Sequence, residues 1–500
     1  MVKITAHGAA QRVAGRKDIL EAAGKKIGLD CGYGYDNVRT FPEGYDPQSL
    51  DCIVLGHPHV DHIGMLSDAF VAGFRKPVYC TWATADTSKN QIQQEIYSTM
   101  MHNKRVDDLK ARGLGKDLEY EKQRYTYQDF KKIMELFVPF ETFEGEKVQR
   151  GFPYLEPIKI SNNITAYLYD AGHSTGSAEV LFEIIESGKM VKILSSCDRG
   201  RNDIDMPILR KPNTRFPKDI DAVLMECTYG DKTHEPIENS IGALEKAVWD
   251  TYQKNGKLIM PAFAITRTAI AKVLLYRMFK EGRFPKGMLI HSSSPGADKD
   301  GRIILKYPQY LDERAIKEFE KKYDCPFKFE ILVRHIKLQD LKNYLEAGVA
   351  SNPSIILASS GMCQDGRIDR ILRHEIEDDK NTITLLGFQA PGTRGYLLDQ
   401  ARISGEKIMV PFYDKAVRLG AEVRKIGGFS CHPDIIEAIA HVNNLYNPKK
   451  DFGKRKPLKI LLEHGEKENC ERARKKYIEA GHKPENVIVM EEGKTYEIAA

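Results

Sequence analysis

The apolar residues of the chain fall into short runs separated by longer stretches with helical periodicity. Residues 2–6, 26–29 and 51–55 have the length and composition of short buried strands, and apolar and polar positions alternate over 164–168. Residues 63–69 predict the start of a helix just after the third of these strands. This mixture of strands and helices predicts an α/β protein.

The middle of the chain alternates regularly between helical and strand patterns. The pattern predicts helices over 241–252, 268–279 and 315–322, and strands over 257–260 and 288–291. Alternation of this kind is typical of a parallel sheet with helices around it. The sequence contains no internal repeat and no low-complexity linker, so we do not expect this segment to be a tethered module.

Length and composition indicate a globular protein of more than one domain. Five hundred residues exceed the size of one compact core and predict two or three domains. No apolar run approaches the roughly 20 residues of a membrane span, and charges occur throughout the first 32 residues, which is unlike a signal peptide. We therefore expect a cytoplasmic protein without a membrane partner.

Cysteine usage and net charge add two weaker constraints. The nine cysteines include no CxxC pair and predict buried thiols in a reducing compartment, neither disulfides nor a thiolate zinc site. A net charge of +5 permits a polyanionic partner without indicating one.

Potential metal ligands are densest in residues 55–64, LGHPHVDHIG, on the loop after the strand at 51–55. Neutral imidazole and carboxylate groups suit Zn²⁺ or a similar divalent ion. The two-residue spacing of His57 and His59 directs both rings to one side of extended backbone, and Asp61 and His62 face a second position. Four merely solvated loop residues would not explain three imidazoles within six positions. The sequence therefore predicts a metal site here.

Other polar residues also stand at the ends of predicted strands. Asp30, His173, Asp198 and Glu226 each follow or close an apolar run. Taken singly, such residues more often form turns or face solvent than build a site. Their place at strand ends does not by itself assign them a role.

Several motifs resemble those of one known family. The HPHVDH cluster resembles the HxHxDH motif of the metallo-β-lactamase superfamily, and LDCG around Asp30 resembles its LDxG motif. Residues 226–230, ECTYG, resemble motif A of the β-CASP subgroup, GFSCH ending at His432 resembles motif B, and HGE beginning at His464 resembles motif C. Between them, three loops resemble the PxFAxxR, SxGM and glycine-threonine-glycine elements of that subgroup, namely 261–267, 359–362 and 387–395.

The resemblance covers nearly the whole chain and implies a fold. The expected architecture is α/β: a metallo-β-lactamase αββα sandwich with an inserted α/β cap, the β-CASP domain. The expected division assigns residues 1–230 to the first part of the sandwich domain, 231–402 to the cap and 403–500 to the second part.

The resemblance also implies the roles of site residues. Two Zn²⁺ ions are expected, with Mn²⁺ or another divalent metal as the alternative. One ion takes His57, His59 and His173, the other takes Asp61, His62 and His464, and Asp198 bridges them. The catalytic set comprises Asp61, His432 as the proton donor, Glu226 orienting it, and Asp30 supporting the ligands. The expected substrate-binding residues are Arg267, Ser359, Ser360, Gly361, Gly392 and Thr393.

Such a site implies hydrolysis of phosphodiester bonds, because two bridged cations stabilise both the attacking and the leaving oxygen. In the family, histidine in motif C accompanies enzymes that act on RNA, so His464 implies single-stranded RNA as substrate. The GFSxH form of motif B resembles that of the 3′-end-processing endonucleases, and 5′-exonuclease activity of the RNase J kind stays open. A homodimer also stays open, with residues 487–500 as an edge strand or a dimer contact.

Two other interpretations are weighed against this one. A small-molecule hydrolase of the thioesterase or lactonase kind would keep the ligands without needing the cap, Arg267 or His432. A non-catalytic RNA-processing partner would usually lose ligands, and this chain keeps all seven. Gly56 in place of serine or threonine and Cys197 in place of glycine depart from the family pattern, as does Ile265-Thr266 before Arg267, but none removes a ligand.

Overall fold

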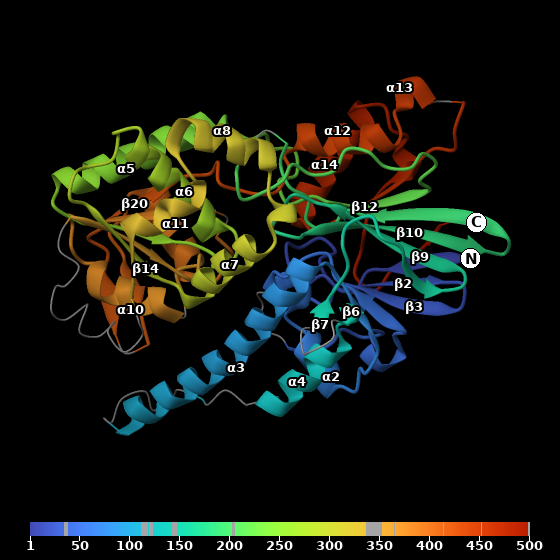
Figure 1. Cartoon of the computed structure of the whole chain (residues 1–500), viewed down its shortest axis with the longest axis horizontal. Helices are drawn as coiled ribbons and strands as arrows, with labels where there is room; N and C mark the ends of the chain where they lie inside the picture. The colour runs from blue at the N-terminus through green and yellow to red at the C-terminus, as the bar shows by residue number, and fades with distance from the viewer. Residues whose placement is uncertain are drawn as a thin grey trace.

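The chain forms two lobes that lie side by side in Figure 1. The computed structural model describes residues 1–34, 39–111, 119, 124–142, 148–202, 206–336, 353–364, 366–387, 389–413, 415–451 and 453–498. Both ends of the chain lie in the right-hand lobe, and the middle of the chain builds the left-hand lobe.

Two facing sheets form the centre of the right-hand lobe. The first has the strand order β23-β1-β2-β3-β4-β5, with bounds Thr495–Ile498, Val2–Thr5, Asp18–Ala22, Lys25–Leu29, Cys52–Val54 and Val78–Tyr79. The second has the order β22-β21-β12-β11-β10-β9-β8, with bounds Val487–Val489, Lys459–Glu463, Ala222–Glu226, Lys189–Ser195, Ala178–Glu186, Ile164–Asp170 and Ile158–Ser161. Each sheet therefore combines strands from the beginning and the end of the chain.

Alternating side chains place each sheet between two apolar layers. Leu20 and Ile27 of the first sheet share one core with Phe182 and Leu224 of the second. Val223, the neighbour of Leu224, points to the opposite face, because successive residues of a strand face opposite sides. That outer face packs against α12 (Ile435–Leu445) and α14 (Lys467–Glu479).

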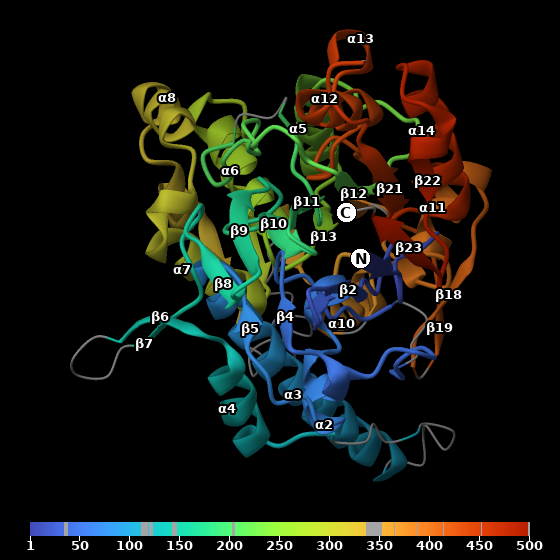
Figure 2. The same cartoon turned by 90° about the vertical axis from the view of Figure 1, so that its right-hand side faces the viewer.

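Helices also cover the outer face of the first sheet. Ile53 of β4 packs with Phe70 of α2 (Leu66–Val71) and Ile133 of α4 (Tyr127–Leu136). The capping box of Thr126 and Asp129 begins α4, as its sequence indicates. The order helix, sheet, sheet, helix is the αββα sandwich that the sequence predicted (Figure 2).

The left-hand lobe is built on a third sheet whose described strands all run parallel. Its order is β15-β14-β16-β13-β17-β20, with bounds Val333–His335, Leu289–Ser293, Ser354–Ala358, Lys257–Pro261, Thr382–Leu385 and Glu422–Lys425. Leu258 packs against one helical layer and Ile259 against another, so helices cover both faces. The expected α/β cap is thereby confirmed.

The helices around this sheet belong to its two apolar cores. They are α5 (Ile237–Gln253), α6 (Arg267–Lys280), α7 (Pro295–Lys306), α8 (Glu313–Tyr323), α10 (Gly366–Glu375) and α11 (Arg394–Ser404). Helix α3 (Trp82–Ala111) leaves the sandwich lobe and packs against α7 (Figure 1). The described residues also form α1 (Val60–Ile63), α13 (Pro448–Asp451), and the strand pairs β6 (Pro139–Thr142) with β7 (Val148–Arg150) and β18 (Met409–Pro411) with β19 (Ala416–Arg418).

The division of the chain into domains stays a prediction, and the third sheet suggests one change to it. Strand β20 pairs with β17, although it lies beyond residue 402 where we expected the cap to end. Helix α11 also continues past that boundary. We propose that the inserted domain extends through β20.

Two further expectations can be compared with the fold. Among the cysteines, all are free thiols, and all but the half-buried Cys325 are buried. Residues 487–498 form β22 and β23 at the edges of the two sandwich sheets, and residues 499–500 lie outside the described part. In the described part of the chain, no helix has both the length and the apolar character needed to cross a bilayer.

Candidate metal centre

The histidine cluster occupies the loop between β4 and α2 and the single turn of α1. His59 is the N-cap of α1, and the N–H groups of His62 and Ile63 donate to its carbonyl at 2.9 and 3.0 Å. The turn therefore places His62 on a different side from His57 and His59. The helix predicted over 63–69 begins earlier, at Val60, and is interrupted before α2.

Two departures from the family pattern compensate for each other at this loop. A Cβ atom built on Gly56 would lie 2.3 Å from the Cys197 Sγ atom, so no side chain fits there. The thiol of Cys197 fills the space that a side chain at position 56 would need. The Gly56 N–H instead donates to the Asp30 Oδ1 atom at 2.7 Å. The loop thus keeps its place with a glycine at position 56.

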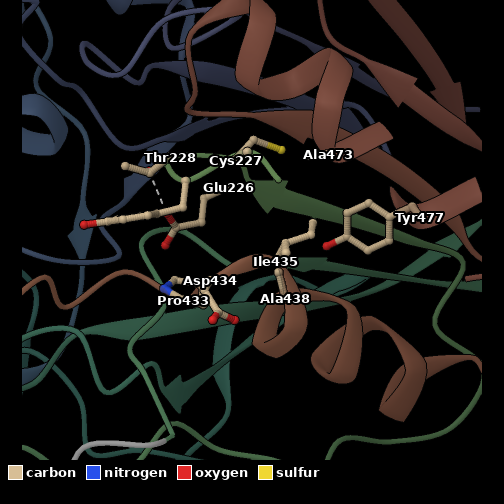
Figure 3. A pocket seen from close by; sticks show the side chains of 11 residues that line it. Glu226, Cys227, Thr228, Pro433, Asp434, Ile435, Ala438, Ala473 and Tyr477 are labelled. Atoms are coloured by element: carbon tan, nitrogen blue, oxygen red, sulfur yellow. Dashed lines mark hydrogen bonds between the residues drawn. The ribbon is translucent and has the colours of Figure 1, made fainter. Parts of the chain in front are cut away.

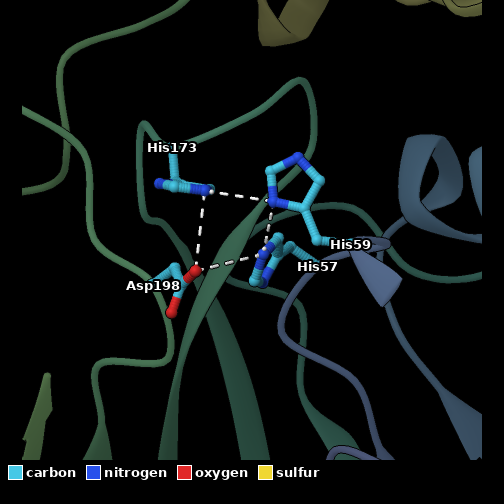
Figure 4. Close-up of side chains that lie close together, drawn as sticks. All are labelled: His57, His59, His173 and Asp198. Atoms are coloured by element: carbon cyan, nitrogen blue, oxygen red, sulfur yellow. Dashed lines mark hydrogen bonds and ion pairs between the residues drawn. The ribbon is translucent and has the colours of Figure 1, made fainter. Parts of the chain in front are cut away.

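The first ligand group consists of three imidazoles and one carboxylate that converge (Figure 4). The His59 Nδ1 atom lies 2.9 Å from His57 Nε2 and 3.2 Å from His173 Nε2. The Asp198 Oδ2 atom lies 3.4 Å from His57 Nε2 and 3.6 Å from His173 Nε2. In a tetrahedral zinc site with bonds of about 2.0–2.2 Å, ligand atoms lie about 3.3–3.6 Å apart. The two distances to Asp198 match this range and the two between imidazoles are shorter, so the four residues converge closely enough to hold one ion.

The second ligand group shares Asp198 and adds Asp61, His62 and His464. The Asp198 Oδ1 atom lies 3.2 Å from His62 Nε2, and Asp61 Oδ2 lies 3.6 Å from His464 Nε2. Three buried atoms of this group, His62 Nε2, Asp198 Oδ1 and His464 Nε2, have no hydrogen-bond partner among the described residues. Buried polar atoms without partners are rare, and their common direction fits a second cation.

The ligands outside the histidine cluster come from the ends of sandwich strands. His173 lies on the connection from β9 to β10, Asp198 follows β11, and His464 follows β21. These strands belong to the second sheet, in which only β12 separates β21 from β11, so residues almost three hundred positions apart meet at one edge. The structure therefore brings together all seven residues that the sequence predicted as ligands.

Burial and neighbouring charges shift the pKa values of the imidazoles in opposite directions in the two ligand groups. Burial lowers the pKa of His59 to about 4, partly opposed by Asp61 and Asp198, and burial also holds the pKa of His57 and His173 well below the ordinary value. Against the opposing effect of burial, Asp198 and Asp61 raise the pKa of His464 to about 9. The carboxylates of the second group thus attract positive charge strongly, as a cation site requires.

Asp30 lies behind the ligands. Its Oδ2 atom accepts a hydrogen bond from His62 Nδ1 at 2.8 Å, which fixes the ring and directs Nε2 into the cluster. Although burial opposes it, His62 and Arg16 lower the pKa of Asp30, which keeps the group ionised. This geometry is consistent with the supporting role that the family resemblance implied.

A fully buried arginine supports Asp30, and we did not single it out from the sequence. The Arg16 guanidinium lies 2.8 Å from Asp30 Oδ2, 2.8 Å from Glu463 Oε1 and 3.3 Å from Asp18 Oδ2. Its Nη1 also lies 3.2 Å from the Cys197 Sγ atom. Asp18 is two residues away, but Asp30, Cys197 and Glu463 come from other parts of the chain, so the local pattern around Arg16 does not indicate this role.

His432, the expected proton donor, lies beside the cluster. Its Nδ1 atom donates to Glu226 Oε2 at 2.8 Å, and the Arg199 N–H donates to Glu226 Oε1 at 2.7 Å. His432, Glu226 and Asp198 form a further group of converging polar atoms. The pairing of His432 with Glu226 is the contact that motifs A and B led us to expect.

Thr228 connects this pair with a metal ligand. Its hydroxyl donates to Glu226 Oε2 at 2.7 Å and lies 3.1 Å from His464 Nδ1. Because a hydroxyl has one proton, donation to Glu226 leaves Thr228 as the acceptor for His464 Nδ1–H. That tautomer leaves His464 Nε2 available to a cation. A small pocket lies behind Glu226 and Thr228, between β12 and helices α12 and α14 (Figure 3).

His234, one of the histidines without an assigned role, supports the loop of motif B. Its backbone N–H donates to Asp434 Oδ2 at 3.0 Å, and its Nε2 atom lies 2.9 Å from the carbonyl oxygen of His432. The ring therefore holds the backbone of His432 rather than facing the cluster.

The cap residues predicted to bind substrate lie on loops after β13, β16 and β17. Arg267 is close enough to help lower the pKa of His59 and His173, after the larger effect of burial. The hydroxyl of Ser360 donates to Gln364 O, and that of Thr393 donates to Ala390 O, so both are used within their own loops. Ser359 pairs with Ser294, Gly361 packs against the ring of Phe263, and Gly392 has a positive φ of 83°.

Comparison with known proteins agrees with this arrangement. A family model described as the Beta-Casp domain matches residues 272–398. Ribonuclease TTHA0252 of Thermus thermophilus is 29% identical over 481 residues, covering 93% of this chain and 94% of the relative. The transcription termination factor FttA of Methanocaldococcus jannaschii is 25% identical and covers 94% of this chain and 68% of FttA. An RNase J-like protein of the same organism is 25% identical, covering 93% of each chain.

The support given by Asp30 leads to a testable prediction. We expect Asp30→Ala to lower metal affinity by about 10–100-fold, because His62 loses the partner that orients its ring. Competition with a chelator of known affinity measures this change. The matched control is Asp68→Ala, which removes a buried carboxylate of the same lobe that pairs with Arg39 and Arg124. Equal affinity of the Asp30 variant and the unaltered protein would contradict the prediction.

Proposed function

The chain belongs to the β-CASP subgroup of the metallo-β-lactamase superfamily, and from this premise we propose that it is a metal-dependent ribonuclease. Its substrate in this proposal is single-stranded RNA, and its reaction is hydrolysis of the phosphodiester bond. We propose endonuclease activity first, with 5′-exonuclease activity as the second mode.

The observation that carries this proposal is the pairing of His432 with Glu226 at the edge of a cluster fit for two cations. A histidine held by a carboxylate is suited to proton transfer near neutral pH. A cluster with a purely structural role would not need a histidine–carboxylate pair beside it. Relatives named as ribonucleases, similar over nearly the whole chain, support the same chemistry.

The residues of the chain supply distinct parts of the reaction. Two bound cations would supply an activated water and the positive charge that stabilises both oxygens at phosphorus. His57, His59 and His173 would hold one cation, Asp61, His62 and His464 the other, and Asp198 would contact both. His432 would give the proton at its Nε2 atom to the leaving oxygen. Glu226 would keep that ring in place through Nδ1.

The cap favours a nucleic acid over a small substrate. The loops that follow three parallel strands lie at one edge of the cap sheet, which is where α/β sheets commonly bind ligands. Arg267 brings a guanidinium to the metal centre, and this group matches the geometry of a phosphate. A thioesterase or lactonase would need neither feature. A non-catalytic partner would not need seven converging ligands.

We propose zinc as the metal, because imidazole and carboxylate in tetrahedral arrangement suit it, with manganese as the alternative. RNA rather than DNA rests on His464 in motif C. We also propose a cytoplasmic location, and a homodimer as one assembly to be tested.

The first prediction of the proposal concerns substrate and mode of cleavage. Metal-loaded protein should cut labelled single-stranded RNA at internal positions and leave DNA of the same sequence intact. RNA with a 5′-phosphate and RNA with a 5′-hydroxyl should be cut equally if the enzyme is an endonuclease. Gel analysis of labelled products measures both properties.

The double variant His59→Ala, Asp61→Ala is the control for contaminating nucleases, because it lacks ligands for both cations. Stepwise loss from phosphorylated 5′ ends would change the proposed mode to exonuclease. Cleavage of DNA with RNA spared would overturn the role given to His464. If neither is cut by protein that holds two metal ions, thioester and lactone substrates become the next test.

The second prediction concerns proton transfer. We expect His432→Ala to reduce kcat by about 10²–10⁴-fold, because loss of a general acid has effects of this size. Metal content should stay unchanged, since His432 is not among the ligands. His482→Ala is a comparison variant that removes an imidazole outside the cluster, which pairs with Asn443. Wild-type kcat in the His432 variant would exclude it as the proton donor.

A further inference from the structure

The loop that leads into α6 contains a strained turn. Thr266 has φ 62° and ψ −54°, and the Arg267 N–H donates to the Ile265 carbonyl at 2.6 Å. This is a γ-turn with positive φ, a rare conformation that is unfavourable for a β-branched residue. Thr266 is 2% exposed, and its side chain makes no capping bond to α6. Contacts outside the turn must therefore hold it.

Asp300 supplies such a contact from α7. Its Oδ2 atom accepts the Thr266 N–H at 2.9 Å, and its side chain is 4% exposed. Burial raises the pKa of Asp300 to about 7, and the bond from Thr266 opposes this rise. Burying a carboxylate is unfavourable unless the group is bonded, and this bond is directed at the strained residue itself. Strain held by a buried polar group is typical of a functional position.

The turn determines where Arg267 points. The guanidinium opposes the rise that burial causes in the pKa of Cys431, so Arg267 lies close to the loop that carries His432. The ring of His432 in turn lies against the first ligand group, with its centroid 4.6 Å from that of His173. The buried Nη1 atom of Arg267 has no hydrogen-bond partner among the described residues.

The backbone opposite Arg267 leaves room for this orientation. A Cβ atom at Gly387 would lie 3.3 Å from Arg267 Nη1, so the guanidinium packs closely over the glycine. A buried guanidinium nitrogen without a partner is a strong donor that is ready for an anionic ligand. Beside a centre that hydrolyses phosphodiesters, that ligand is a phosphate.

We propose that Asp300 is a positioning residue for RNA: it holds the strained turn at Thr266 and so directs Arg267 at a phosphate beside the metal centre. This inference rests on the proposed ribonuclease function. Asp300 does not contact the RNA in this account, and it acts only through the turn. The expected consequence is that loss of Asp300 removes the binding contribution of Arg267.

The test measures RNA affinity as a function of salt in the full-length, metal-loaded protein. A His432→Ala background keeps the ligand residues and slows cleavage, so fluorescence anisotropy of labelled single-stranded RNA can be followed. The salt slope is the steepness with which the logarithm of RNA affinity falls with the logarithm of salt concentration. Arg267→Ala should weaken binding about 10-fold and reduce this slope by about one, as expected for one lost phosphate contact. Asp300→Ala should do the same, and the double variant should be no weaker than Arg267→Ala alone.

Two variants separate positioning from general damage. Asp300→Asn should keep affinity within about threefold, because its side-chain oxygen can accept the same N–H. Asp298→Ala should leave the salt slope unchanged, since Asp298 lies on the same helix but contacts Lys272 and His335. If Asp300→Ala does not fold, it should fold in a Thr266→Gly background, because glycine adopts positive φ freely.

The outcomes distinguish this inference from the function on which it rests. A normal salt slope in Asp300→Ala, or additive losses in the double variant, would overturn the role of Asp300 while the ribonuclease proposal stands. An unchanged slope in Arg267→Ala would overturn the phosphate contact and the inference with it. Absence of RNA binding and cleavage by the unaltered protein would overturn both proposals.

Discussion

The arrangement of the site depends on the Asp198 carboxylate. Its Oδ2 atom faces His57 and His173, and its Oδ1 atom faces His62 and His464. Although burial opposes ionisation, the imidazoles hold the pKa of Asp198 well below its usual range. One charged group at the end of β11 thus relates two ligand groups, in which only His464 comes from the part of the chain that follows the cap.

A buried negative cluster of this kind needs support from the protein itself. Arg16 contacts Asp30 and Glu463 from the first and second sheets, and it lies next to Cys197. Removing one partner of a buried ion pair is usually far more damaging than replacing the whole group, so Arg16 and its carboxylates act as a unit. Asp30, a member of this unit, accepts a hydrogen bond from His62 Nδ1. The same region accommodates Gly56 and Cys197, which depart from the family pattern together and fit each other sterically.

Four of the seven candidate ligands give a local signal, because three histidines and an aspartate within six residues indicate a metal site. His173, Asp198 and His464 were expected only from the family resemblance, because each stands alone in its part of the chain. Arg16, Thr228 and Asp300 were missed because each acts through partners far away in the chain. The boundary that we propose after β20 could not be seen in the sequence, because β20 is short and its pairing with β17 is a tertiary contact. The break between α1 and α2 was missed for a similar reason, since the Met65 N–H donates to Cys31 across the loop.

Zinc-edge anomalous diffraction from crystals of the metal-loaded protein tests the central claim most directly. The account predicts two peaks on either side of Asp198, one bounded by His57, His59 and His173 and the other by Asp61, His62 and His464. A single peak, or peaks elsewhere with this cluster empty, would contradict a centre built for two cations around one shared carboxylate.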